Sequence, residues 1–480
     1  MAREILINAD PRERRVAVVD DGRMEEFYIE RPQDKTIVGN IYKGKIEAII
    51  QSIGGAFVDI GLPKNGFLYL SEIENAFETL DTPHSKPREV KKGEEVLVQV
   101  VKESFGTKGP RLSSEIGIAG RYLVLMPLNA QSGVSRRIED DVERKRLRQI
   151  LAELKFPKGI SFIVRTAACG RSKQELWKDA SFLIKTWARL EKIAKRQKAP
   201  SLVYEEYDLV LRAVRDSFGA DVSKLVVDSK ADYYRIVNFI RTFERQLSRK
   251  VEFYRGDDLF EDKDVERQIL RTFENKVYLK SKAYIIIEPT EGLVVIDVNS
   301  GGFKRNLGQE DMAFKVNCEA AVEAAHQLKL RDLGGIIVID FIDMERESHR
   351  REVLNTLKNA LSTDRAKYDI LGISKFGVVE MTRERIHNTV ASLSYQTCPY
   401  CQGRAKVKSP VTMSIYALKE LKRYLKIKPT REVNLSLNPA VITEISKDNQ
   451  SALRFVERRF RTRVNLVSNP ALHMEDVNIS

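Results

Sequence analysis

The sequence predicts a multidomain protein that combines α/β and α+β parts. Residues 36–117 contain short, evenly spaced strands separated by glycine, which is typical of a small β-barrel. Residues 283–344 read as strand, helix and strand, which is the pattern of a parallel α/β unit. The chain has 480 residues, which is room for about three to four domains.

The composition is that of a globular protein with excess positive charge. Hydrophobic residues make up 42% and charged residues 31%, and no apolar run approaches a membrane-spanning helix. The net charge of +13 favours polyanions such as RNA, DNA or an anionic membrane face, and nucleic acid ranks above a membrane because no long basic amphipathic helix has an aromatic face. Four cysteines exclude a disulfide framework, and the N-terminus reads as a strand followed by charge. We therefore expect a cytoplasmic protein.

The first predicted element has no partner nearby. Residues 1–35 alternate in β fashion around an Asp-Gly turn, but they are too short for a domain and must complete a sheet formed later. Residues 208–273 offer the strand-like runs DLVLRAVRD and KLVVDS and then a helix. We predict one domain built from these two segments, interrupted by residues 36–117 and 118–207.

Residues 36–117 are expected to form a barrel of the OB type. The stretches GGAFVDIG and NGFLYLSEI are similar to the S1-type RNA-binding fold. In such barrels exposed aromatic rings stack on bases while lysines follow the phosphates. Phe57 and Phe67 are the candidate rings, and the alternative is that both belong to the barrel core. The candidate phosphate contacts are Lys43, Lys45 and Lys108.

Residues 118–207 form a further α/β portion. YLVLMPLN and GISFIVRTAACG read as strands, and residues 139–155 and 174–198 read as charged helices. The second strand ends in Arg165 and Thr166. An arginine beside a threonine can hold a terminal phosphate through forked donation. The alternative is an ordinary solvated strand end.

Residues 274–394 contain the strongest candidate for chemistry. LVVID ends in Asp297, a helix is expected over residues 308–330, and GGIIVIDFIDM then carries Asp340. Side chains alternate along a strand, so Asp297 and Asn299 share one face. Parallel neighbours point the same way, and Asp297 and Asp340 are therefore expected side by side where α/β sheets place their ligands.

Two carboxylates this close repel each other unless a cation lies between them. Mg²⁺ is the usual oxygen-seeking candidate. Asp343 is a weaker candidate, because three positions beyond Asp340 it should point elsewhere on the strand. The alternative is that these acids only cap strand ends and pair with nearby arginines.

A single cysteine motif, CPYC, joins residues 274–394 to a small C-terminal domain at residues 408–480. Cys398 and Cys401 have the spacing of a zinc knuckle, but structural zinc takes four ligands and the sequence has no second C-x₂-C motif. Half a zinc site completed by a second subunit, a redox pair and incidental thiols are the three interpretations. A redox pair needs a thioredoxin-like context, which the sequence does not indicate.

Taken in order, these motifs resemble the catalytic half of the ribonuclease E/G family. The resemblance covers essentially the whole chain through VRTA, IDVNSGG, GGIIVIDFIDM and CPYC, and the lack of a long tail favours the compact members. It implies a ribonuclease H-like subdomain from residues 1–35 and 208–273 and a 5′-phosphate sensor domain at 118–207. A DNase I-like catalytic subdomain at 274–394 and a zinc link at 395–407 follow.

The resemblance also implies a Mg²⁺-dependent endoribonuclease that cuts single-stranded, A/U-rich RNA in rRNA maturation and mRNA decay. It would leave 5′-phosphate and 3′-hydroxyl ends and be stimulated by a 5′-monophosphate. The residues so assigned are Asp297 and Asp340 for Mg²⁺, Asn299 for orientation, Arg165 and Thr166 for the 5′-phosphate, Phe57, Phe67 and Lys108 for RNA, and Cys398 and Cys401 for a zinc shared by two chains. Dimer and tetramer stay open. Ala405 departs from the family, which usually has a second glycine there.

Two other classes of function compete with this one. A non-catalytic RNA-binding scaffold accounts for the basic charge and the barrel, with the acids as strand caps, and Mg²⁺-dependent turnover separates it from an enzyme. The other class is a nuclease or phosphotransferase acting on DNA or a nucleotide. The sequence has no G-x-x-x-x-G-K-[ST] loop, which argues against NTP chemistry.

Overall fold

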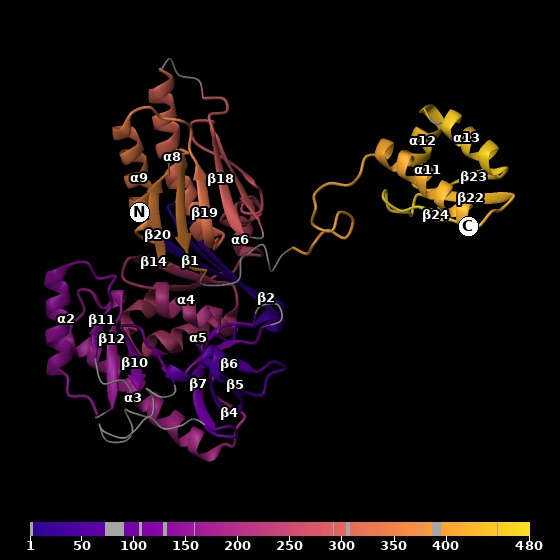
Figure 1. Ribbon diagram of the computed structural model, residues 1–480. Coiled ribbons are helices and arrows are strands. Elements are labelled where there is room, and N and C mark those ends of the chain that lie inside the picture. The colour runs from indigo at the N-terminus through magenta and orange to yellow at the C-terminus, as the bar shows by residue number, and fades with distance from the viewer. Residues whose placement is uncertain are drawn as a thin grey trace. The chain divides into compact units, whose positions relative to one another are not determined.

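Figure 1 shows the computed structural model of the chain. The chain forms two compact units, Met1–Val390 and Ala391–Ser480, which are described separately. The structure describes residues 3–72, 91–104, 108–127, 132–157, 159–290, 292–303, 308–374, 376–385, 395–448 and 450–480.

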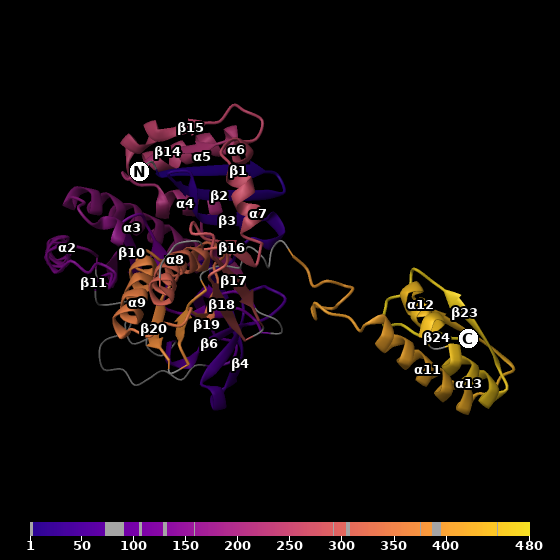
Figure 2. The same ribbon diagram turned by 90° about the horizontal axis from the view of Figure 1, so that it is seen from above.

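The N-terminal strands belong to a sheet that is completed late in the chain. β1 (Arg3–Asp10), β2 (Glu13–Asp20) and β3 (Arg23–Glu30) lie beside β14 (Val222–Val227) and β15 (Val251–Phe253), in the order β15-β14-β1-β2-β3 (Figure 2). β1 pairs with β2 antiparallel and with β14 in parallel. The strands of residues 1–35 therefore complete a sheet formed later in the chain, as the sequence predicts.

Helices cover both faces of this sheet. α4 (Leu209–Ser217) and α5 (Lys230–Arg241) bury the side of Ile5 and Ile7, while α6 (Leu259–Asp262) and α7 (Val265–Arg271) bury the opposite side. The short η4 (Arg245–Lys250) precedes β15. Alternate strand residues thus pack into two separate cores, which explains the apolar character of β1.

The prediction of a strand over DLVLRAVRD is wrong, because this run forms α4. Asp208 caps the helix by accepting a hydrogen bond from the backbone N–H of Leu211 at 3.1 Å. Seven of the nine residues of α4 are buried. A helix buried on most sides lacks the polar face by which helical periodicity is recognised.

The second domain of the main unit is a closed barrel. Its strands are β4 (Ile41–Ile50), β5 (Gly55–Asp59), β6 (Gly66–Tyr69), β8 (Arg111–Ser113) and β7 (Glu95–Lys102). They follow one another in this order, and β7 pairs back to β4, which closes the barrel. Two short 3₁₀ turns occur here: η1 (Pro32–Asp34) lies between β3 and β4, and η2 (Gln51–Ile53) directly follows β4.

A four-stranded sheet follows the barrel and matches the predicted strands and helices. It comprises β9 (Ile118–Ala119), β10 (Leu123–Pro127), β11 (Gly133–Val134) and β12 (Ile160–Val164), with α2 (Asp141–Glu153), η3 (Thr166–Ala168) and α3 (Lys173–Arg196). The next strand, β13 (Ser201–Tyr204), pairs instead with β4 of the barrel. The segment expected at 118–207 therefore contributes one strand to the sheet of the barrel expected at 36–117.

The sheet that carries the predicted acids has one covered and one open face. Its order is β16 (Lys276–Tyr278), β17 (Tyr284–Pro289), β18 (Leu293–Asn299), β19 (Gly335–Asp340), β21 (Val378–Arg383) and β20 (Tyr368–Ile373). β18 and β19 pair in parallel, and the other neighbours pair antiparallel. α8 (Gln309–Leu330) and α9 (Glu347–Leu361) pack side by side against one face (Figure 1). The opposite face is called the open face below.

The second unit is a small α/β domain. Three helices, α11 (Pro410–Ile427), α12 (Pro439–Asp448) and α13 (Gln450–Phe460), pack with a sheet of β23 (Arg463–Ser468), β22 (Glu432–Leu437) and β24 (Asn478–Ile479). In the whole described chain, no helix has the length and apolar character that a membrane crossing requires.

Candidate active site

The two predicted metal ligands lie at the carboxyl ends of neighbouring strands. The parallel register of β18 and β19 places Asp297 directly opposite Asp340. Ile296 and Ile339 are buried toward the helices, so the two aspartates, one position further along, belong to the open face. Adjacent strands are about 4.8 Å apart. Asp297 and Asp340, called the carboxylate pair below, can therefore reach one cation, as the sequence predicts.

Asn299 and Asn317 fix the surroundings of the carboxylate pair. Asn299 Nδ2 donates a 2.7 Å hydrogen bond to Asp297 Oδ2, which orients this carboxylate. Asn317 of α8 is buried and holds the segment after β19, donating to the Ile342 carbonyl at 2.7 Å and accepting from the Ile342 N–H at 3.0 Å. Sequence reasoning identified Asn299 but missed Asn317, which looks like any polar residue within an apolar helix.

The electrostatics of the carboxylate pair favour a cation. Partial burial raises the pKa of Asp340, and the negative charges of Asp297 and Asp343 raise it further. Within the described residues, no lysine or arginine forms an ion pair with any of these three carboxylates. The alternative of strand-end acids paired with arginines is therefore not what the structure shows. Asp343 is close enough to raise the pKa of Asp340. Strand alternation does not direct its side chain elsewhere, because β19 already ends at Asp340.

The pair fits Mg²⁺ better than a metal held entirely by protein. In the described ranges, no three His, Cys, Asp or Glu side chains gather in a metal-binding arrangement. Mg²⁺ commonly takes one or two carboxylates and completes its octahedron with water and substrate phosphate oxygens. Two hard oxygen ligands on an open face match this pattern.

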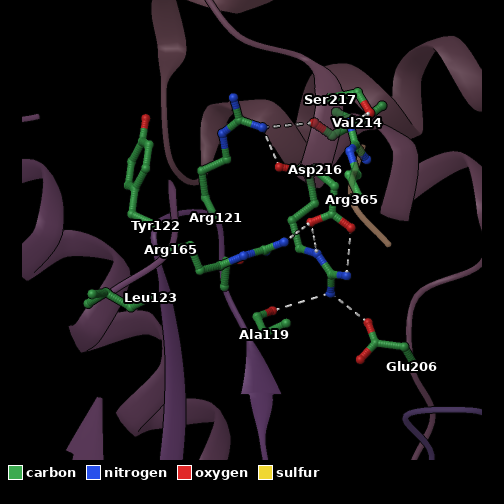
Figure 3. Close-up of polar contacts among 12 residues, drawn as sticks. Ala119, Arg121, Tyr122, Leu123, Arg165, Glu206, Val214, Asp216, Ser217 and Arg365 are labelled. Carbon is green, nitrogen blue, oxygen red and sulfur yellow. Dashed lines mark hydrogen bonds and ion pairs between the residues drawn. The ribbon is translucent and has the colours of Figure 1, made fainter. Parts of the chain in front are cut away.

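A second charged centre surrounds Arg165. Its Nη2 donates to Asp216 Oδ1 at 2.7 Å (Figure 3). Its Nη1 donates to the Gly120 carbonyl at 2.6 Å. Arg215 holds both oxygens of Asp216 at 3.0 Å and also contacts Glu206 at 2.7 Å. Arg165, Arg215, Asp216 and Glu206 are called the arginine cluster below. The cluster fixes Arg165 and leaves its side chain 26% exposed.

The charges of the arginine cluster satisfy one another. Burial opposes the ionisation of Asp216, but the positive charges of Arg215 and Arg165 outweigh it and hold the pKa of Asp216 well below its usual range. Arg121, which is buried beside the cluster, donates to the backbone carbonyls of Arg215 and Val214 (Figure 3). Thr166 follows Arg165 as the exposed first residue of η3.

The barrel presents a row of aromatic rings on its outer surface. Phe57 and Phe67 alternate with the buried Ala56, Val58 and Leu68, so both rings lie outside the barrel core and are half-buried. Their centroids are 5.8 Å apart, and Tyr69 lies 5.0 Å from Phe67. The alternative that both phenylalanines are core residues is therefore wrong.

Two further residues shape this aromatic row. A Cβ at Gly55 would lie 2.3 Å from the Phe67 ring, so only glycine lets the ring cross β5. Arg111 pairs with Phe67 in the strand register, and its guanidinium lies 4.9 Å from the Tyr69 ring centroid. Sequence reasoning missed Tyr69 and Arg111. The signals available were the YL that follows the NGFL motif, which contains Tyr69, and the stretch PRLSS, which contains Arg111.

The predicted lysines differ in their availability. Lys43 Nζ forms an ion pair with Glu95 at 2.7 Å and donates to the Gln197 carbonyl at 2.9 Å. The hydrogen bond from Lys43 lowers the pKa of Glu95. Lys43 thus connects barrel strands to the end of α3, whereas Lys45 and Lys108 are exposed.

The cysteine motif forms a turn whose hydrogen bonds favour the thiolate form of Cys398. Backbone N–H groups of Cys401 and Tyr400, and the Cys401 side chain, hydrogen-bond to Cys398 and lower its pKa. His473 Nε2 lies 2.6 Å from the Tyr400 carbonyl oxygen, which attaches the turn to the C-terminal segment. Ala405 has a φ of 54°, in the left-handed region where glycine is favoured. All four cysteines are free.

Known proteins match every major part of this chain. Residues 117–386 match the Ribonuclease E/G family, and residues 35–115 match the S1 RNA binding domain. The chain is 38% identical to Ribonuclease G of Escherichia coli (strain K12) over 487 residues, covering 100% of this chain and 99% of the relative. The chain belongs to the ribonuclease E/G family. It is therefore an endoribonuclease, a hydrolase, with an S1 RNA-binding domain, and the scaffold alternative is set aside.

Two more relatives extend this family assignment. Ribonuclease G of Salmonella typhimurium (strain SL1344) is 38% identical over 100% of this chain and 99% of its own length. Ribonuclease E of Escherichia coli (strain K12) is 38% identical over 95% of this chain but only 44% of its own length. This chain therefore corresponds to the full length of the G-type relatives.

The C-terminal unit corrects one expectation. Residues 397–480 match a domain described as "RNase E/G, Thioredoxin-like domain", so a thioredoxin-like context is present. The cysteine pair nevertheless lies in a turn that precedes Ser409, the N-cap of α11. A thioredoxin-type redox pair depends on a helix N-terminus to lower the thiol pKa, and in this ribonuclease E/G-family chain backbone N–H groups of the turn do so instead.

Proposed function

We propose that this ribonuclease E/G-family enzyme cuts single-stranded, A/U-rich RNA at a Mg²⁺ site formed by Asp297 and Asp340. The observation that supports this proposal is the in-register carboxylate pair on the open face, with no basic partner among the described residues. The products would carry 5′-phosphate and 3′-hydroxyl ends, and the RNAs would be those of rRNA maturation and mRNA decay.

The residues of the site have separate roles in this proposal. Asp297 and Asp340 would hold the ion, and Asn299 keeps Asp297 oriented through its 2.7 Å hydrogen bond. Bound Mg²⁺ would supply a more acidic water and neutralise charge on the phosphate. Attack by water on phosphorus breaks the P–O3′ bond, and the proton that the water loses balances the one gained by the 3′-oxygen.

The test is cleavage of a 5′-monophosphorylated, A/U-rich single-stranded RNA in Mg²⁺. Asp297→Asn should bind this RNA as wild type does but should not cut it, because the aromatic row of the barrel is separate from the carboxylate pair. Asp369→Asn, which alters an exposed carboxylate on β20 of the same sheet, is the matched control and should cut normally. Cleavage by Asp297→Asn, or equal loss of binding and cleavage, would contradict the assignment.

We further propose that Arg165 and Thr166 bind the 5′-monophosphate. Asp216 and the Gly120 carbonyl fix the guanidinium of Arg165, whose side chain keeps 26% exposure next to the exposed Thr166 hydroxyl. A prearranged fork of N–H donors is suited to a phosphate. Arg165→Gln and Thr166→Val should slow cutting of 5′-monophosphorylated RNA toward the rate for 5′-hydroxyl RNA. A loss shared equally by both substrates would oppose this role.

We also propose that Cys398 and Cys401 supply two of four ligands to a zinc ion shared by two chains. The lowered pKa of Cys398 favours the thiolate that zinc binds. Metal analysis together with light scattering should give one zinc per two chains, in either a dimer or a tetramer built from two dimers. Cys398→Ser should lose zinc and dimer together, while Cys169→Ser, at another exposed cysteine, should keep both. One zinc per chain would reject the shared site.

A further inference from the structure

Two tyrosines and a lysine lie on the open face beside the carboxylate pair. In the strand register Tyr278 is opposite Tyr284, and Tyr284 is opposite Asn299. Lys276 belongs to the neighbouring row, which crosses the sheet through Ile286 to Asp297. Val277, between Lys276 and Tyr278, packs toward the core, so its two neighbours face outward.

The three side chains form one compact group. The Tyr278 and Tyr284 ring centroids are 6.1 Å apart at an interplanar angle of 62°. Lys276 Nζ lies 3.7 Å from the Tyr284 centroid and 5.0 Å from the Tyr278 centroid. A Cβ at Gly301 would lie 3.1 Å from the Tyr284 ring, so the loop after Asn299 lies close to that ring.

Tyr284 is therefore held in place, whereas Tyr278 is available. Lys276 and the Gly301 backbone lie against Tyr284. Tyr278 is 68% exposed, although its ring is supported at its edge by Tyr284. An exposed ring fixed by a second ring and accompanied by an ammonium group has the components of a nucleotide subsite. The ring can stack on a base while the ammonium attracts the adjoining phosphate.

The position of this group on the sheet also suits a nucleotide of bound RNA. Tyr278 on β16 is two strand spacings, or about 10 Å, from Asn299 on β18, and Asp297 lies two residues from Asn299 along the same strand. An RNA strand that brings a phosphate to the carboxylate pair must cross this open face, and a nucleotide near the cut spans such a distance. The aromatic row of the barrel belongs to a different sheet, so the group beside the pair would be a separate contact with the RNA.

We propose that Tyr278, supported by Tyr284 and Lys276, stacks on a nucleobase close to the scissile phosphate. This subsite rests on the proposed function, because the carboxylate pair must be where the phosphate is cut. It would position the RNA through the face of a base, so it would accept any base without reading its hydrogen-bonding edge.

The experiment is a cycle that combines enzyme variants with abasic RNA substrates. Tyr278→Ala should lower kcat/KM by about 5- to 140-fold, the range of one base–aromatic stack. Tyr278→Phe should keep most activity, because stacking needs the ring and not the hydroxyl. Tyr234→Ala, at a 56% exposed tyrosine of α5, is the control and should cut as wild type does. The RNA series lacks one base at a time on each side of the cut.

At one abasic position, wild type should lose about as much as Tyr278→Ala loses on intact RNA, and the variant should lose nothing further. The stacking proposal is overturned if the loss from Tyr278→Ala and the loss from the missing base multiply at every position. It is also overturned if Tyr278→Phe loses as much activity as Tyr278→Ala. Asp297→Asn is measured alongside. If Asp297→Asn still cuts, the catalytic assignment fails. If Asp297→Asn is inactive but the losses from Tyr278→Ala and the missing base multiply, only the stacking proposal fails.

Discussion

The carboxylate pair and the arginine cluster differ in what neutralises their acids. Asp216 accepts hydrogen bonds from Arg165 and Arg215, and their charges keep its pKa below the usual range. Asp340 lies opposite Asp297, and this charge adds to burial in raising the pKa of Asp340. The aspartate of the first centre is neutralised by arginines of the same chain, whereas the two aspartates of the second have no basic partner among the described residues.

This difference indicates which acids serve structure and which serve chemistry. Gathering like charges costs stability unless a ligand compensates, so carboxylates left together point to a functional site. An acid between two arginines instead stabilises the fold by attraction. The pKa shifts of opposite sign at Asp340 and Asp216 are the physical expression of this contrast.

The largest expected effect is on catalysis at the carboxylate pair. Asp340→Asn should lower the rate of cleavage by about a thousandfold or more, since a catalytic metal supplies several kcal/mol. The same change should leave the melting temperature in EDTA unchanged or higher, because it removes a repulsion. Single-turnover cleavage and calorimetry on one preparation provide both values. A variant that unfolds more easily would show that the pair is structural.

The next effect is on stability at the arginine cluster. Asp216→Asn should lower the free energy of unfolding by about 2–3 kcal/mol, less than a fully buried pair would cost because its side chain is 22% exposed. Asp221→Asn removes an ion pair whose aspartate side chain is 63% exposed, and it should cost under about 0.5 kcal/mol. Chemical denaturation measures both. Equal effects at these two sites would show that the arginine cluster stabilises the fold no more than an exposed ion pair does.

The pH dependence of stability should have opposite signs at the two centres. The pKa of Asp340 is raised in the folded chain, so its favourable contribution exists at low pH and is lost as the pH rises from about 3.9 through the folded value. The pKa of Asp216 is lowered, so its contribution exists above about 3.9 and is lost as the pH falls through the folded value.

Unfolding free energies in EDTA over the acidic range, for wild type, Asp340→Asn and Asp216→Asn, measure these contributions. The difference between wild type and each variant isolates the aspartate that was replaced. Differences that slope the same way for both variants would contradict the comparison. If Mg²⁺ binds at the carboxylate pair as proposed, added Mg²⁺ should reduce the Asp340 difference and leave the Asp216 difference unchanged.

The smallest effect should come from backbone conformation and not from charge. Ala405 has a φ of 54°, where a side chain meets steric resistance and glycine does not. Ala405→Gly should stabilise the turn against opening by up to about 1 kcal/mol. Hydrogen exchange of the turn amides should show this gain equally at acidic and neutral pH. A gain that depended on pH would mean that charge also acts here.

The carboxylate pair could be predicted because it depends on local rules. Strand alternation and one parallel crossover suffice to place Asp297 beside Asp340, and the structure has them in register. The arginine cluster could not be predicted in this way, because Arg165 meets Asp216 across 51 residues. The available cue was an arginine before an aspartate in AVRDS, at the end of a run that reads as a strand but forms α4.

The side chains on the barrel show the same limit. Alternation along β5 and β6 separates Phe57 and Phe67 from the core, which a strand pattern can predict. Whether a lysine is free depends on remote groups, and Lys43 is engaged by Glu95 and the Gln197 carbonyl. Periodicity assigns faces, but it does not reveal which charged groups are already paired.

The pairing of β1 with β14 has a consequence for how the protein is made. Asn8 and Asp228 join these strands by a 2.6 Å hydrogen bond although they are 220 residues apart. A ribosome adds about 5–20 residues per second, so β1 waits roughly 10–45 s after synthesis for its parallel neighbour. During translation the barrel strands β4 to β8 are complete long before β14 emerges. The nascent chain therefore carries a folded insert while the edge of β1 stays open to chaperones.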